Sequence, residues 1–127
     1  ILNGGELDGS RILSSSTVHL MAQNHIGELE AANSIVSSAP SLSNDVDMLP
    51  NSVDKFGLGF LINSEPVPGG RSAGSLAWAG MYNSYYWIDI EKGICGVLIT
   101  QILPFYDADV VTLFDNFEKA VYAVANQ

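Results

Sequence analysis

The sequence is poor in basic residues. Five lysines and arginines stand against fourteen aspartates and glutamates in 127 residues, which gives a formal net charge of −9. A surface of this sign repels phosphate backbones and anionic headgroups, so we expect neither a nucleic-acid nor a membrane partner. Apolar runs are also short, well below the roughly 18 residues that a membrane-spanning helix needs.

Cysteine is almost absent, since Cys95 is the only one. An intramolecular disulfide is therefore excluded. The cysteine content does not indicate in which cellular compartment the protein is found. Because Cys95 lies within the apolar run of residues 94–103, we expect it to be a buried small hydrophobic residue.

Common cofactor patterns are missing as well. Gly57-Leu58-Gly59 is only half of a phosphate-binding glycine motif and lies in a predicted strand. His19 and His25 have no second ligand at zinc-site spacing, although His25 could instead line a site. The acidic residues form no calcium loop. We therefore expect no metal and no cofactor.

The composition fits one globular domain over residues 1–127, with 47% hydrophobic and 15% charged residues. Residues 1–5 are typical of a last helical turn ending in a glycine cap, without a signal peptide. We interpret the chain as a fragment or a trimmed chain, namely the C-terminal part of a larger domain.

The first half predicts little regular structure. Asp8-Gly9 indicates a turn, and Ser14 is a candidate cap for a helix that ends near residues 24–27. Residues 28–54 are rich in Ser, Asn, Asp and Pro and predict a variable loop, with a short helical turn possible at 28–36. Such a loop is either a lid or binding loop, or disordered.

The second half predicts a sheet. Residues 56–62 indicate a short extra strand, and residues 75–80, 82–90 and 94–103 a three-stranded antiparallel meander with a hairpin turn at 91–93. The third strand is apolar almost throughout, as expected of a strand covered on both faces.

A C-terminal helix should cover this sheet. Asp107 is its predicted cap, and an apolar stripe runs from Val110 to Val124 at helical spacing. Packing of that stripe on the meander predicts the α+β class.

Two chemical candidates have simpler explanations. Ser52-Val53-Asp54-Lys55 matches the Ser-x-x-Lys pattern of serine enzymes, but it follows Pro50-Asn51 and precedes a glycine-rich strand instead of starting a helix. We interpret it as a chance match. The aromatic residues of the second meander strand either stack on a ligand or, as we favour, form core and cross-strand pairs: Tyr82, Tyr85, Tyr86 and Trp87.

The order of these pieces resembles a known family. A capped helix, a variable loop, "FGLGF", "GSLAWAGMYNSYYWIDIEKGICGVLITQILP" and a terminal amphipathic helix follow one another. This order is similar to the C-terminal portion of the serine β-lactamase-like superfamily, in its esterase, class C β-lactamase and D-aminopeptidase branch of penicillin-binding-protein-like hydrolases. The similarity is most specific over residues 56–103.

The resemblance implies a role for Trp78-Ala79-Gly80. The family carries Lys-Thr-Gly, His-Thr-Gly or Trp-Gly-Gly on this strand, and the sequence resembles the third, esterase-like form. Trp78, Ala79 and Gly80 would then border the substrate, and the backbone N–H of Met81 would donate to the oxyanion hole. The alternative is that Trp78 only packs and Gly80 forms a bulge.

The sequence departs from the family in two respects. The nucleophile helix and the Tyr-x-Asn or Tyr-x-Ser motif lie far upstream in the family, whereas here Tyr82-Asn83-Ser84 follows the triad. The triad also has no lysine to hold a carboxylate, which favours esterase action over β-lactamase or carboxypeptidase action. The resemblance implies acyl hydrolysis through a serine ester, with this chain inactive alone. The alternative is a free-standing, non-catalytic module that binds a small molecule or a protein.

The partner expectation concerns residues 94–103. In the family two N-terminal strands pair with this strand, and without them it is an apolar edge. We expect the missing N-terminal part or a second copy of the chain to cover it, the latter as a two-fold homo-oligomer.

Overall fold

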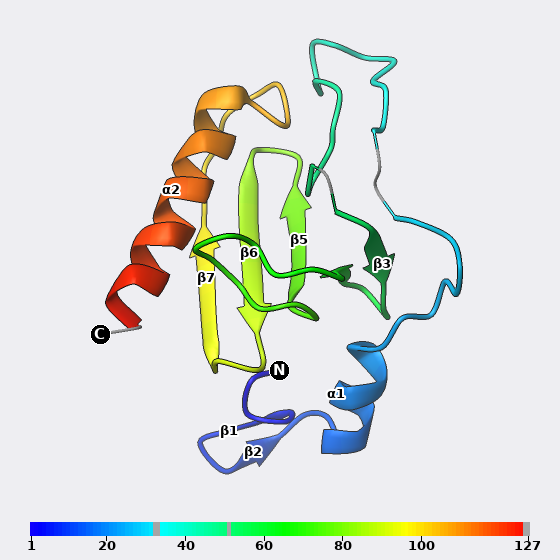
Figure 1. Ribbon diagram of the computed structural model, residues 1–127, viewed down its shortest axis with the longest axis vertical. Coiled ribbons are helices and arrows are strands. Elements are labelled where there is room, and N and C mark those ends of the chain that lie inside the picture. The colour runs from blue at the N-terminus through cyan, green and yellow to red at the C-terminus, as the bar shows by residue number, and fades with distance from the viewer. Residues whose placement is uncertain (32–33, 51, 126–127) are drawn as a thin grey trace.

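The computed structural model describes residues 1–31, 34–50 and 52–125. Its centre is an antiparallel meander in the order β3-β4-β5-β6-β7, with one long helix beside it (Figure 1). The strands are β3 (Asp54–Phe56), β4 (Leu61–Asn63), β5 (Leu76–Gly80), β6 (Ser84–Asp89) and β7 (Ile94–Leu98). The helix is α2 (Ala108–Ala125). The α+β class and the packing of the C-terminal helix on the sheet are therefore confirmed.

The N-terminal elements lie at one end of the sheet (Figure 1). Strands β1 (Glu6–Leu7) and β2 (Ser10–Arg11) form a hairpin around the predicted turn. Helix α1 (Ser15–Met21) begins where predicted, because the Ser14 hydroxyl accepts a hydrogen bond from the Thr17 N–H. It ends at Met21, several residues earlier than expected.

The prediction of one strand over residues 56–62 is wrong. The segment turns back on itself, and β3 pairs with β4 in a hairpin in which Phe56 is opposite Leu61. The Gly57 N–H donates to the Phe60 carbonyl, and Gly59 has a φ of +94°, which only glycine adopts without strain. The apolar residues of the 56–62 segment therefore did not indicate the turn that lies between β3 and β4.

Strand β7 is shorter than predicted and is covered on one face. Ile94 and Leu98 pack against the core beneath α2, whereas the alternate side chains Cys95 and Val97 are exposed. The expectation of a buried Cys95 is therefore wrong. The sheet has only one covering helix along this strand, so an apolar sequence does not imply two buried faces.

The core forms where β6 meets α2. Trp87 is fully buried, with its ring centroid 5.5 Å from Phe114 and 5.4 Å from Phe117. Tyr85, also buried, stacks on Phe105 at 6.0 Å. The core interpretation of the alternating aromatic residues is confirmed for Tyr85 and Trp87.

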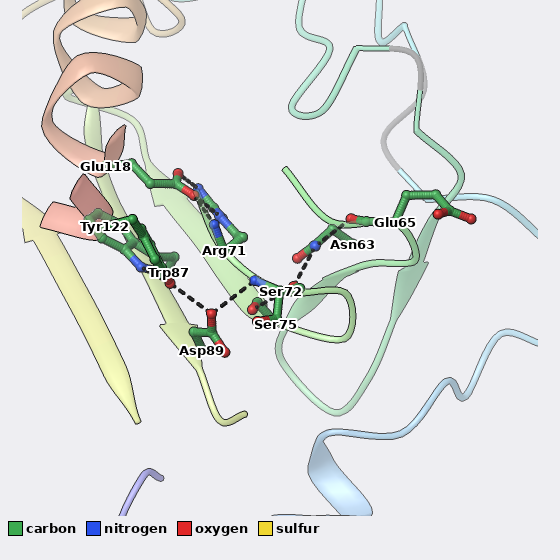
Figure 2. Close-up of polar contacts among 9 residues, drawn as sticks. All are labelled: Asn63, Glu65, Arg71, Ser72, Ser75, Trp87, Asp89, Glu118 and Tyr122. Carbon is green, nitrogen blue, oxygen red and sulfur yellow. Dashed lines mark hydrogen bonds and ion pairs between the residues drawn. The ribbon is translucent and has the colours of Figure 1, made fainter. Parts of the chain in front are cut away.

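A buried polar network joins the 64–75 connection to α2 (Figure 2). The Arg71 guanidinium donates to both carboxylate oxygens of Glu118, at 2.9 and 2.5 Å. Nearby, Asp89 accepts hydrogen bonds from the Ser72 N–H and the Tyr122 hydroxyl. Burial alone would raise the pKa of Asp89, but these bonds and one from the Lys92 N–H hold it below its ordinary value.

Among the described residues, no helix is long and apolar enough to cross a membrane.

Candidate functional site

An open groove of about 290 Å³ lies at the end of β5. One wall is the segment that the sequence analysis singled out, Trp78 to Met81. The other wall consists mostly of apolar side chains from distant parts of the chain, namely Ile35, Ser43, Val46, Met48 and Phe105. The groove is therefore largely apolar, with backbone at one edge.

Trp78 lies on this wall without being sealed in the interior. Its side chain is 41% exposed, and its ring meets Phe56 edge-on at 5.1 Å. Trp78 thus packs against Phe56 and also lines the groove.

Gly80 keeps the groove open at its end. It pairs with Ser84 in unbroken register, so the bulge alternative is wrong. A Cβ at this position would lie 3.9 Å from its nearest neighbour, the side chain of Ser84. Packing within the chain does not require glycine here, whereas close approach of a ligand to the backbone would.

The backbone N–H of Met81 is available at the rim. Met81 is exposed where β5 gives way to the turn, and its N–H donates to none of the residues that the structure describes. An unpaired N–H beside an apolar groove is suited to an oxygen acceptor of a ligand.

The turn that carries Met81 is held by Asn83, which sequence reasoning missed. Asn83 is fully buried with a φ of +60°. Its Nδ2 donates to the carbonyls of Ile102 and Pro104, at 2.9 and 2.8 Å. Its Oδ1 accepts from the Tyr85 hydroxyl and from the Asp107 N–H.

Thr100 adds to this anchoring, because its hydroxyl lies 2.6 Å from the Tyr82 carbonyl and 2.9 Å from that of Asn83. One asparagine and one threonine therefore tie the β5–β6 turn to the connection between β7 and α2. The rim of the groove is a fixed structure.

The predicted variable loop supplies the facing wall. Ile35 and Val46 form an antiparallel bridge, the Asn44 N–H donates to the Phe105 carbonyl, and the Phe105 N–H donates to the Leu42 carbonyl. The Tyr106 hydroxyl also donates to the Asp47 carbonyl. In its described parts the 28–36 segment forms no helix. Isolated apolar residues in a polar stretch were the only sequence signal for this wall.

The Ser-x-x-Lys tetrad is not at the groove. It lies on no helix, and Lys55 Nζ donates instead to the Gly27 and Leu29 carbonyls, at 3.1 and 2.9 Å. The structure thus favours the interpretation of a chance match.

The two histidines make local contacts. His19 Nε2 lies 2.9 Å from Gln23 Nε2, and His25 Nε2 lies 2.7 Å from the Leu20 carbonyl. Neither lines the groove. In the described ranges, no three His, Cys, Asp or Glu side chains gather as a metal site would require.

The antiparallel sheet and its covering helix have a β-lactamase-like α+β fold. No protein-family model matches the chain. It is 30% identical to the ML-236A carboxylate methylbutanoyltransferase of Penicillium citrinum, over 97% of this chain and 30% of that protein. It is likewise 30% identical to the lovastatin esterase of Penicillium rubens, over 87% of this chain and 29% of the esterase.

Solved structures agree with the sequence similarity. A mutant simvastatin synthase from Aspergillus terreus superimposes with a TM-score of 0.76 and 30% identity, over 91% of this chain and 29% of the synthase. The chain therefore spans about 30% of the length of the relatives that it matches. These similarities support the resemblance to the serine β-lactamase-like superfamily.

Proposed function

We propose that this chain is the cleft-wall portion of a serine acyl hydrolase or acyltransferase whose reaction passes through a serine ester. Its relatives at 30% identity carry the names of a methylbutanoyltransferase and an esterase, and these names refer to acyl transfer and to ester cleavage. The groove suits such a substrate, because apolar side chains surround most of it and the backbone of the triad forms one edge.

Within this proposal, Trp78, Ala79 and Gly80 contact the acyl substrate and the Met81 N–H donates to the oxyanion. The observation that carries these roles is the exposed N–H of Met81 on a turn fixed by Asn83. A donor held in place stabilises developing negative charge without reorganising, and one such donor contributes about 3 kcal/mol to catalysis.

The chain alone should be inactive, because the groove contains no nucleophilic serine paired with a base. Incubation with p-nitrophenyl butyrate should release p-nitrophenol no faster than buffer does. Hydrolysis that disappears in Ser52→Ala would contradict both the inactivity and the chance origin of the tetrad.

Ligand binding tests the cleft wall without turnover. Methyl 2-methylbutanoate, titrated into ¹⁵N-labelled chain, should shift the amide signal of Met81 and the indole signal of Trp78. Trp78→Ala should weaken binding several-fold, whereas Val97→Ala, on the exposed face of β7, should not. Shifts confined to other regions would refute the assigned roles.

The second candidate is a free-standing module that binds a small molecule or protein without catalysis. It is favoured by a groove that forms although none of the described helices carries a Ser-x-x-Lys pattern. The coding sequence upstream of Ile1 discriminates between the two. A longer open reading frame that encodes Ser-x-x-Lys well upstream of Ile1 supports the hydrolase. An intact open reading frame that starts near Ile1 supports the non-catalytic module.

The proposed partner covers β7, the strand at the end of the described sheet. Val97 on this strand and Ile99 just beyond it have 59% and 80% of their surfaces exposed. The N-terminal part of the same hydrolase, or a second copy of the chain, would pair with this strand and bury both side chains.

A further inference from the structure

Asp54 and Asn63 face each other at the start of the β3–β4 hairpin. They are direct partners in the antiparallel register, so both side chains lie on the same face. Both are sealed from solvent, with 0% and 1% of their surfaces exposed. An aspartate is rarely buried this completely without a cationic partner.

The hydrogen bonds of this pair leave acceptor oxygens unpaired on both side chains. Asn63 Nδ2 donates to the Glu65 and Ser72 carbonyls, at 2.8 and 2.9 Å (Figure 2). Asn63 Oδ1 and both carboxylate oxygens of Asp54 have no hydrogen-bond partner within the geometric limits among the described residues, and neither has the Ser52 hydroxyl, the buried donor that acts on Asp54. Buried acceptors without a donor cost the desolvation free energy of each group.

The surrounding charges do not supply a counterion. Arg71 acts electrostatically on Asp54, but its guanidinium is hydrogen-bonded to both carboxylate oxygens of Glu118. Asp47 adds a like charge. Burial, reinforced by Asp47, raises the pKa of Asp54 to about 6, against the opposing effects of the Ser52 hydroxyl and Arg71.

We propose that Asp54 binds a proton and donates it to Asn63 Oδ1, which makes the hairpin a proton-controlled clasp for the 34–50 loop. A neutral carboxyl has one O–H donor and one acceptor, so a single proton pairs two otherwise unpaired oxygens.

The clasp acts on the groove because the loop is anchored at Asp54. The Ala31 N–H donates to the Asp54 carbonyl at 2.9 Å, so the chain before the loop meets the chain after it at this residue. Between these points, Ile35, Val46 and Met48 line the groove. With Asp54 neutral, the base of the loop is closed. With Asp54 ionised, the buried charge favours opening of the hairpin toward water.

The importance of the clasp for an acyl reaction rests on the proposed function, but its test needs no turnover. Asp54→Asn mimics the neutral acid, since its amide retains a donor and an acceptor. Amide exchange over residues 34–50, corrected for intrinsic rates, should become faster in the wild-type chain from pH 5 to pH 7. The variant should stay slow throughout.

The size of the effect follows from proton linkage. A carboxyl whose pKa rises from 3.8 to about 6 on folding changes the folding equilibrium constant roughly tenfold between pH 5 and pH 7, with the less stable state at pH 7. Asp54→Asn should lack this tenfold change. The control Glu65→Gln removes an exposed acid beside the same network and should keep it.

A ¹³C titration of the wild-type carboxyl tests the proposal even if the variant does not fold. The signal of Asp54 should titrate near pH 6. Titration below pH 4.5, or Asp54→Asn with the same pH dependence of exchange as the wild-type chain, would overturn the clasp. The clasp would also be overturned if the amides of residues 34–50 stayed protected from exchange at pH 7 in both the wild-type chain and Asp54→Asn.

Discussion

Glu118 on α2 holds Arg71 through both carboxylate oxygens and also accepts a hydrogen bond from its backbone N–H. The guanidinium carbon lies 5.6 Å from the centre of the Trp87 ring and 5.7 Å from that of Phe114. A residue from an irregular connection is thus placed in the centre of the core, where it links β6 to the helix. This relationship makes the 64–75 segment part of the folded unit.

Glu118→Gln should strongly destabilise the chain. It leaves the Arg71 guanidinium buried at 4% exposure without its counterion, and loss of one partner from a buried pair costs about 3–5 kcal/mol. Urea denaturation followed by tryptophan fluorescence measures the change.

The matched control is the exposed pair between Arg11 and Glu6. Glu6→Gln removes a similar contact in water and should cost less than about 1 kcal/mol. Equal losses in the two variants would mean that burial of the Arg71 pair is not what makes it important.

Gly96→Ala should disrupt the contact between β7 and β6. A Cβ at Gly96 would lie 2.0 Å from the Trp87 ring, which is fixed by its own packing. We expect a loss of roughly 1–3 kcal/mol in the free energy of unfolding, or a displaced strand. A change in near-ultraviolet circular dichroism would report the displaced Trp87.

Gly80→Ala serves as the contrasting variant. Its Cβ finds space within the chain, so thermal unfolding should be nearly unchanged. Binding of methyl 2-methylbutanoate should weaken, because the added methyl group occupies the end of the groove. A fold-disrupting Gly80→Ala would show instead that the glycine is structural.

The thiol of Cys95 should react in the native state. Its side chain is exposed beside Ile1 and Leu2. Ellman's reagent should label one equivalent without denaturant, at a rate close to that in urea, and Cys95→Ser provides the blank. The reaction is run at a dilution at which light scattering finds the monomer, and labelling that still requires unfolding there would contradict the exposed thiol.

Residues 94–98 should mediate self-association of the isolated chain. The expected result by multi-angle light scattering is a dimer whose population rises with concentration. Val97→Lys places a charge in the proposed contact and should shift the equilibrium to monomer. A wild-type monomer with rapid amide exchange along β7 would contradict the proposal.

The sequence predicted the elements with strong periodicity. Alternation along residues 82–90 and the apolar stripe after Asp107 led to β6 and α2, because each is a local pattern with one buried face. The serine cap of α1 was equally local. The β3–β4 hairpin was missed because its turn lies inside an apolar run.

The groove was only half predictable. Trp78 to Met81 came from a motif, whereas Ile35, Val46 and Phe105 meet through folding of distant segments. Asn83 was overlooked because nothing local distinguishes a buried asparagine from a turn asparagine. Its importance follows from four hydrogen bonds to groups as far along the chain as Asp107.

Asn83 has a consequence for how this architecture tolerates change. A single amide spans the β5–β6 turn and the approach to α2, so an insertion in either connection would pull one set of contacts out of reach. The 34–50 loop is tied to the Phe105 region largely through backbone hydrogen bonds, which do not depend on the identity of its side chains. Diversity in substrate preference among proteins built this way should therefore accumulate in that loop, while the lengths of the other two connections stay constant.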